Sequence, residues 1–157
     1  MGRSQPHRSL PTPPFGGVGD DEASRYVLGV SNPLVTGSML RCTMGLTPAP
    51  LNVLPVNRVL GQGPPVGNIM DNKPMVNILP FGLCRSIANP VVASATAAAL
   101  GVLVPMPCVP VTPAPWISSS RVLVGGAPVI TKSSKCMCIW GGQISPLATP
   151  AVTIKAG

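Results

Sequence analysis

Residues 69–84 read IMDNKPMVNILPFGLC and carry the pattern that decides the predicted fold. An apolar pair at 69–70 precedes residues 71–74, DNKP, which form a typical turn sequence. Asn and Asp tolerate the backbone angles of tight turns, and Pro presets one of them. Residues 75–78, MVNI, then fit a second strand, and a Pro-Phe-Gly bend leads to Cys84. The stretch predicts a hairpin followed by a bend and a thiol.

The same unit recurs at residues 122–138, VLVGGAPVITKSSKCMC, where a four-residue turn again ends in Pro and the chain reaches Cys136 and Cys138. A more degenerate copy, LVTGSMLRCTMG at 34–45, contains Cys42. Repeats of one supersecondary unit indicate a stacked or symmetric architecture. Three units that each deliver a cysteine to a common point would form a metal-binding apex with approximate threefold symmetry.

The composition favours a mainly β domain. The 21 Pro and 17 Gly in 157 residues would by themselves suggest disorder. However, 45% hydrophobic residues exceeds what disordered chains contain. Short strands joined by tight turns reconcile the two observations. Residues 1–33, rich in Pro, Gly, Ser and charge, are predicted to be an N-terminal extension, flexible or wrapping, that precedes one domain at residues 34–157.

The charge pattern argues against nucleic-acid binding. The net charge is +7, and Asp71 is the one acidic residue from residue 34 onward. Nucleic-acid binding requires clustered basic residues with interleaved aromatics. Only 3% of this chain is aromatic, and the basic residues of the domain are spread singly. They are Arg41, Arg58, Lys73, Arg85, Arg121, Lys132, Lys135 and Lys155.

Residues 90–104 form the most apolar run of the sequence. The run is shorter than the ~20 residues that a membrane span needs. Asn89 suits a helix N-cap, Pro90 the first helical position and Gly101 the exit. We therefore predict one short, Ala-rich and largely buried helix at about 90–100. Residues 1–30 lack the apolar core of a signal peptide, so we expect synthesis in the cytoplasm.

The five cysteines allow three interpretations. Free Cys often packs as a small hydrophobe, so all five thiols can be core residues. A structural zinc site would need four Cys or His ligands in a closed tetrahedral shell. Disulfides are the third interpretation, disfavoured by the odd count and the missing secretory signal. A Cys136–Cys138 bridge would also be strained. Spacing alone leaves the first two interpretations open.

The sequence offers little for catalysis, and we expect no enzymatic activity. A nucleophilic cysteine needs a base, and the sole histidine, His7, lies in the extension. Asp71 is alone in the domain and is interpreted as a turn-forming residue. Paired carboxylates for acid–base chemistry are therefore absent from the domain sequence.

Several long motifs, in order, resemble a PAAR-like family of bacterial spike-tip proteins. The motifs cover about residues 34–145. They are VTGSMLRCTMG, LNVLPVNRV, IMDNKPMVNILPFGLC, SIANPVVASATAAALGVLVPMPCVPVTPAPW and VLVGGAPVITKSSKCMCIWGGQI. The resemblance implies a small cone of short β-strands with pseudo-threefold symmetry and a metal ion near the sharp end.

The resemblance also implies a function. Such domains cap and sharpen a trimeric VgrG-like spike, one tip per trimer, in type VI secretion systems and extracellular phage-tail-like injection particles. The tip contacts the target membrane transiently as it pierces it, and it reaches the extracellular space or the target cell with the particle. The expected function is a structural spike tip. The alternative is an adaptor that attaches effector cargo through residues 1–33, an extension longer than the family pattern.

By position, the resemblance assigns the metal ligands to Cys42, Cys84 and Cys138, with Cys108 as the fourth. Cys136 takes a place where an apolar residue is usual in the family, so it is the spare thiol or a substitute for one ligand. Other members use mixtures of His and Cys, whereas this domain has no His. Four cysteines still suit structural zinc.

Overall fold

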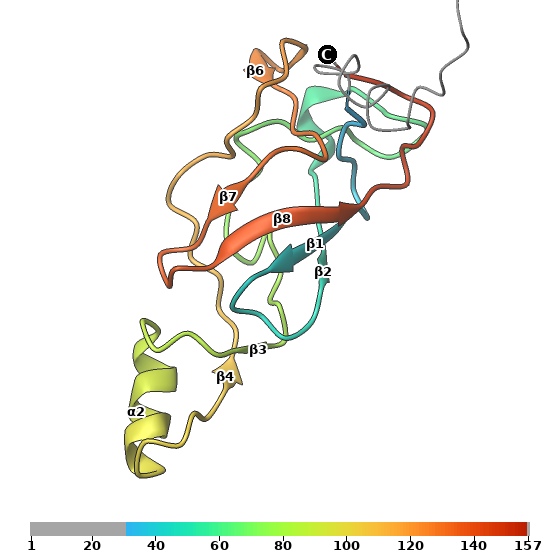
Figure 1. The fold of residues 1–157 in the computed structure, drawn as a ribbon. Helices are drawn as coiled ribbons and strands as arrows, with labels where there is room; N and C mark the ends of the chain where they lie inside the picture. Colours follow the sequence, from blue (N-terminus) through green and yellow to red (C-terminus); the bar gives the residue numbers. More distant parts are fainter. Residues whose placement is uncertain (1–30, 157) are drawn as a thin grey trace, which may run out of the picture.

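The computed structural model describes residues 31–156, which fold as a mainly β structure with small sheets and one α-helix (Figure 1). This confirms the predicted fold class; the cone outline and threefold symmetry stay predictions. The elements are β1 (Met39–Cys42), β2 (Ala49–Pro50), the 3-10 helix η1 (Pro55–Asn57), β3 (Leu83–Cys84), α2 (Pro90–Ala98), β4 (Met106–Pro107), β5 (Leu123–Val124), β6 (Ala127–Pro128), β7 (Cys136–Met137) and β8 (Gln143–Ala148).

The largest sheet has the strand order β2-β1-β8-β7. Its longest ladder joins β1 to β8, antiparallel, with Arg41 opposite Ser145 and Cys42 opposite Ile144. Side chains alternate between the two faces of a strand, and Leu40 and Cys42 are accordingly both buried. The pairing brings an early and a late segment of the chain together. Because β8 pairs with both β1 and β7, it holds these two strands in one sheet.

The predicted hairpin at residues 122–130 is confirmed, with a tighter turn than expected. β5 and β6 pair antiparallel, with Val124 opposite Ala127. The connecting Gly125 and Gly126 have φ angles of 60° and 80°. Both central residues of a type I′ turn need positive φ, which a Gly-Gly pair provides. Pro128 therefore lies in β6 and not in the turn.

The predicted hairpin at residues 69–78 is wrong. Side chains hold this segment in local turns, where they compete with a strand ladder. The Asp71 carboxylate accepts the Asn68 backbone N–H at 2.8 Å, and the Asn77 side-chain oxygen accepts the Lys73 N–H at 3.2 Å. Ile78 bridges to Leu51 instead of returning along residues 69–70. Asp71 is confirmed as a turn-forming residue.

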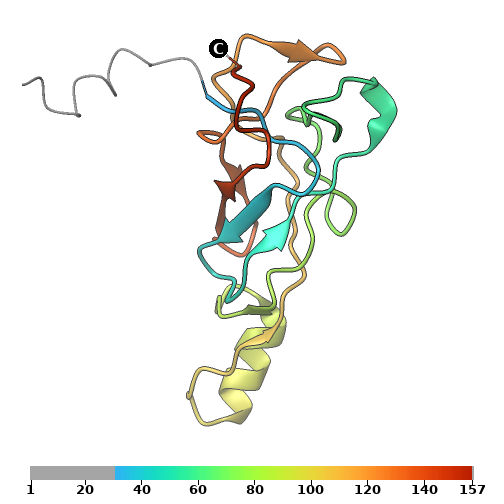
Figure 2. The same ribbon diagram turned by 90° about the vertical axis from the view of Figure 1, so that its right-hand side faces the viewer.

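The predicted helix is confirmed in position, but the prediction of its burial is wrong. α2 begins at Pro90, and the Asn89 side chain accepts the Val91 N–H, as an N-cap does. Gly101 follows with a φ of 89°. Val92 is the one fully buried residue of α2. Both views show the helix beside β4 and projecting away from the four-stranded sheet, so most of its surface has no partner in the described part of the chain (Figures 1 and 2). No helix among the described residues is long and apolar enough to cross a membrane.

Residues 31–33 take part in the described fold, although the sequence places them in the extension. Ser31 bridges to Ala156, and Pro33 bridges to Thr131. The Asn32 side chain donates to the Ala151 carbonyl at 2.8 Å. The beginning and the end of the described chain therefore meet at the end of the molecule opposite α2 (Figure 1). Residues 1–30 of the extension predicted at 1–33, with His7, lie outside the described residues.

The main core surrounds two buried aromatic rings. Phe81 is fully buried, and Trp116 is nearly so while its indole N–H donates to the Asp71 carbonyl at 3.0 Å. Val92 joins this cluster, which ties the base of α2 to the body. A second cluster at the end opposite α2 contains Val35, Val66, Val124, Val129, Ala151 and Ala156.

Replacing Phe81 with Ala should lower the free energy of unfolding by about 3–5 kcal/mol, since it removes a fully buried ring from a packed core. Val56→Ala is the matched control, because Val56 is 72% exposed and should change stability by less than about 0.5 kcal/mol. Urea denaturation measures both. Similar losses for the two variants would contradict the assignment of Phe81 to the core.

Candidate metal centre

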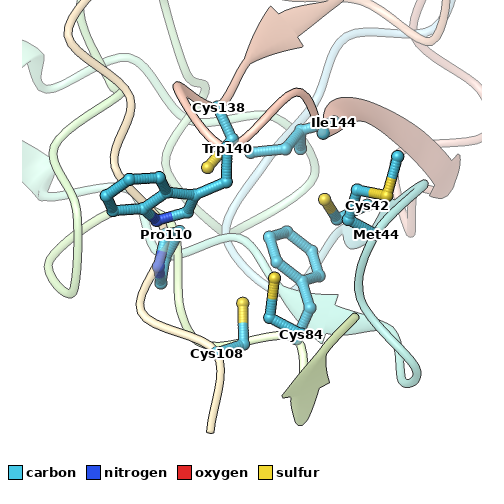
Figure 3. Close-up of a pocket in the computed structure, with 10 residues that line it drawn as sticks. Cys42, Met44, Cys84, Cys108, Pro110, Cys138, Trp140 and Ile144 are labelled. Atoms are coloured by element: carbon cyan, nitrogen blue, oxygen red, sulfur yellow. The ribbon is translucent and has the colours of Figure 1, made fainter. Parts of the chain in front are cut away.

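Four of the five cysteines line one small cavity (Figure 3). Cys42 ends β1, Cys84 ends β3, Cys108 follows β4 directly, and Cys138 follows β7 directly. The cavity volume is about 10 Å³, roughly the space of one water-sized sphere. It has room for a single ion and not for an organic ligand. The remaining lining residues are Met44, Phe81, Pro110, Trp140, Gly142 and Ile144.

Backbone pairing positions Cys42 and Cys138. The Cys138 N–H donates to the Gly142 carbonyl at 2.8 Å, which closes the turn between β7 and β8 beside the cavity. A Cβ atom on Gly142 would lie 2.5 Å from the Cys42 sulfur, well inside van der Waals contact. Glycine at this position therefore allows the end of β1 to approach the β7–β8 turn.

A second set of contacts positions Cys84 and Cys108. β3 pairs with β4, with Cys84 opposite Met106. The Cys108 N–H donates to the Gly82 carbonyl at 2.8 Å, which continues this pairing beyond β4. Cys84 also bridges to Gly45, in the turn that follows β1. The β3–β4 ribbon is thereby attached to the main sheet at the cavity.

Burial favours the neutral form of two of the cavity thiols, Cys42 and Cys108. Burial raises the pKa of Cys42 and of Cys108 above the ordinary thiol value, and the neighbouring thiols raise it further because adjacent negative charges repel. Backbone hydrogen bonds from Met44 and Gly45 act in the opposite direction on the pKa of Cys42. The Val111 N–H also donates to the Cys138 sulfur at 3.4 Å. Several thiolates in this cavity would need a cation to balance their charge.

Cys136 lies apart from the cavity. It is fully buried, its thiol points to the Ala114 carbonyl at 3.8 Å, and it does not line the cavity. Burial raises its pKa to about 11. The structure therefore brings together the four cysteines first assigned as ligands and separates the one assigned as spare. Their role as metal ligands stays a prediction.

The four thiols are chemically suited to zinc, but their present spacing does not form a metal site. Within residues 31–156, no three His, Cys, Asp or Glu side chains are arranged to hold a metal ion. Figure 3 shows the four sulfur atoms facing the same space from different sides. Four thiols with backbone N–H donors and no carboxylate are a donor set typical of structural zinc. All five cysteines are free thiols.

A protein-family model described as "Domain of unknown function (DUF4280)" matches residues 34–149. The chain belongs to the DUF4280 family. The match includes all four cavity cysteines and the apolar helix. No curated protein and no solved structure matches the chain.

Sequence reasoning missed the non-cysteine residues of the cavity in this DUF4280 domain, among them Phe81, Trp140 and Gly142. Trp140 connects the thiol-bearing segments: its indole N–H donates to the Val109 carbonyl at 3.1 Å, and its own carbonyl accepts the Ser86 hydroxyl. The sequence signal was Trp-Gly-Gly at residues 140–142, separated from the last cysteine by Ile139 alone, since a large ring followed by two glycines is typical of a tight, packed turn.

Burial of Cys136 should make stability depend on alkaline pH. Its folded pKa of about 11 lies above the value of 9.0 for a free thiol, so the folded state holds the proton more tightly. The stabilisation is complete below pH 9 and is lost as pH rises toward 11, by on the order of 2 kcal/mol.

Urea denaturation of the reduced, chelator-treated protein between pH 8 and 11 tests this. Cys136→Ala is the matched control and should show a shallower decline between pH 9 and 11. Equal declines in both proteins would contradict the burial of an ionisable thiol at position 136.

Proposed function

We propose that this DUF4280 protein is a structural spike tip of the PAAR-like type, which caps a trimeric VgrG-like spike of a contractile injection system and holds one zinc ion. The convergence of Cys42, Cys84, Cys108 and Cys138 on one ion-sized cavity carries the proposal. These residues are distant in sequence and come from four different segments. Such convergence is the expected arrangement for a metal that fastens a small fold together.

Zinc would supply cohesion that the strands lack. β3, β4 and β7, which deliver three of the thiols, are each two residues long. An isolated pair of short strands is marginal in water. A zinc ion bound to four thiolates would cross-link these segments and compensate the charge of the sulfurs. In the metal-free state the cavity would hold neutral thiols and contribute only packing.

The end opposite α2 supports the capping role. η1 and β5 lie there, with Val56 exposed to 72% and Leu123 to 60%. Exposed apolar side chains gathered at one end are typical of a protein–protein contact surface. The described chain also starts and finishes at this end, where Ser31 pairs with Ala156. An extension attached at Ser31 would therefore begin beside the spike and at the end of the molecule opposite α2.

Elemental analysis of the protein purified with zinc should give about one zinc per chain. Cys42→Ser and Cys84→Ser should each abolish stoichiometric zinc binding and lower Tm by about 10 °C or more, since a structural metal contributes several kcal/mol of folding free energy. Cys136→Ser is the matched control and should keep its zinc. A metal-free wild-type protein whose Tm does not change with added zinc or chelator would contradict the site.

Capping should be visible as co-purification of one chain with three copies of the spike protein. Val56→Asp with Leu123→Asp should weaken this complex at least tenfold, since both substitutions place charge in the apolar end. Deletion of residues 1–30 separates the adaptor alternative: normal capping with lost cargo would favour it. A stable homotrimer of this chain alone would contradict the capping role.

A further inference from the structure

The most unusual surface of the molecule is the apolar arm, which we define as residues 86–104. It consists of the segment that leads into α2, α2 itself, the turn that follows and the irregular segment that returns to β4. It projects away from the four-stranded sheet, on the side where β3 and β4 lie (Figures 1 and 2). The sequence contains no charged residue and no His from residue 86 to residue 120. A soluble surface element of this length would normally carry several charges.

The arm exposes large apolar side chains on more than one side. Leu100 is 97% exposed and Val102 is 68% exposed, and Ile87 and Val91 are each about half exposed. The exposed residues of α2 itself are small or apolar, with Ser94 as the one polar exception. Helices that bind a protein groove, or lie along a membrane surface, have one apolar and one polar face. A helix that is apolar all round suits a hydrocarbon environment instead.

Several polar groups of the arm have hydrogen-bond partners within the arm itself. The Asn89 side chain accepts the Val91 N–H, and the Gly101 N–H donates back to the Thr96 carbonyl at 2.9 Å. The Ser94 hydroxyl donates to the Val91 carbonyl, and the Thr96 hydroxyl oxygen accepts the Val104 N–H. Groups at both ends of α2 and the hydroxyls of Ser94 and Thr96 thus have partners within the arm, while the Ser86 hydroxyl at its base donates to the Trp140 carbonyl. This matches the requirement of a lipid interior, where no water replaces a missing hydrogen bond.

The length of the arm sets the depth it can reach. The nine residues of α2 rise about 14 Å, compared with about 30 Å for the hydrocarbon core of a bilayer. The arm therefore matches a single leaflet. Val92 packs into the main core together with Cys84 and Cys108, so the helix has a fixed base.

We propose that the apolar arm inserts into the outer hydrocarbon leaflet of a target membrane and is the part of the tip that enters lipid first. This inference rests on the proposed tip function for its context, but it is tested on the protein alone. The occupant is the acyl-chain region of a neutral bilayer, and the arm needs no charged headgroup to bind it.

Flotation of the full chain with phosphatidylcholine vesicles in 0.5 M NaCl tests the proposal. Neutral lipid and high salt remove the attraction that a net charge of +7 has for anionic membranes. The wild-type protein should float with the vesicles. Leu100→Asp with Val102→Asp should lower the partition coefficient at least tenfold, because charge is excluded from hydrocarbon. Leu100 has a φ of 54°, which Asp tolerates, so this variant should keep its fold.

The matched control is Val56→Asp with Leu123→Asp, which adds the same charge to exposed apolar positions at the other end of the molecule. It should bind vesicles within twofold of wild type. A second measurement uses Val102→Trp with brominated lipids, which should quench the added fluorophore. Absent flotation of the wild type, equal flotation of the arm variant, or no quenching would each overturn the proposal.

The same variants separate this inference from the proposed function. The arm variant should still co-purify with the trimeric spike, whereas the control variant should lose it. Lipid binding without capping would contradict the tip function but would still support insertion of the arm into lipid. If the wild type instead forms oligomers that the arm variant dissolves, without floating, then a second copy covers the arm and the proposal is overturned.

Discussion

The antiparallel pairing of β1 with β8 is the interaction on which the rest of the structure depends. It is the longest ladder of the described fold and joins segments about a hundred residues apart in sequence. Cys42 at the end of β1 and the turn before β8 become neighbours through this register, and the turn carries Cys138 and Gly142. A shift of one residue would move Cys42 to the opposite face of the sheet and remove it from the cavity.

The remaining strands are too short to define the fold through backbone hydrogen bonds alone. Side chains supply much of the missing specificity. Asn68, Asp71 and Asn77 hold the segment before β3 through local hydrogen bonds, and Trp116 fastens that segment to the main core. The thiols lie where these separately held segments meet. A metal at this point would join parts of the chain that share few backbone contacts, which is where a cross-link has its greatest effect.

Local signals in the sequence predicted local structure well and tertiary pairing poorly. Asn89 and Pro90 fixed the start of α2, because capping depends on adjacent residues. The turn predicted at residues 71–74 is wrong in position, since the turns lie on either side at 69–70 and 75–77. The predicted hairpin also failed because Ile78 gains a partner in Leu51, which no local pattern reveals. Burial of α2 was mispredicted for a related reason. A run that is apolar on all sides has no periodicity to show which side, if any, faces a core.

The cysteines show which features of the site can be predicted from sequence position alone. Spacing left both buried thiols and a metal site open, and the family resemblance separated Cys136 from the other four. The geometry adds a mechanical relation that neither source contained. The apolar arm is inserted between Cys84 and Cys108, so a force on α2 passes through β3 and β4 directly to the cavity. A cross-link at that position would stiffen the base of the arm most. One continuous segment of the chain thus contains both the apolar arm and, at its base, two of the thiols that line the cavity.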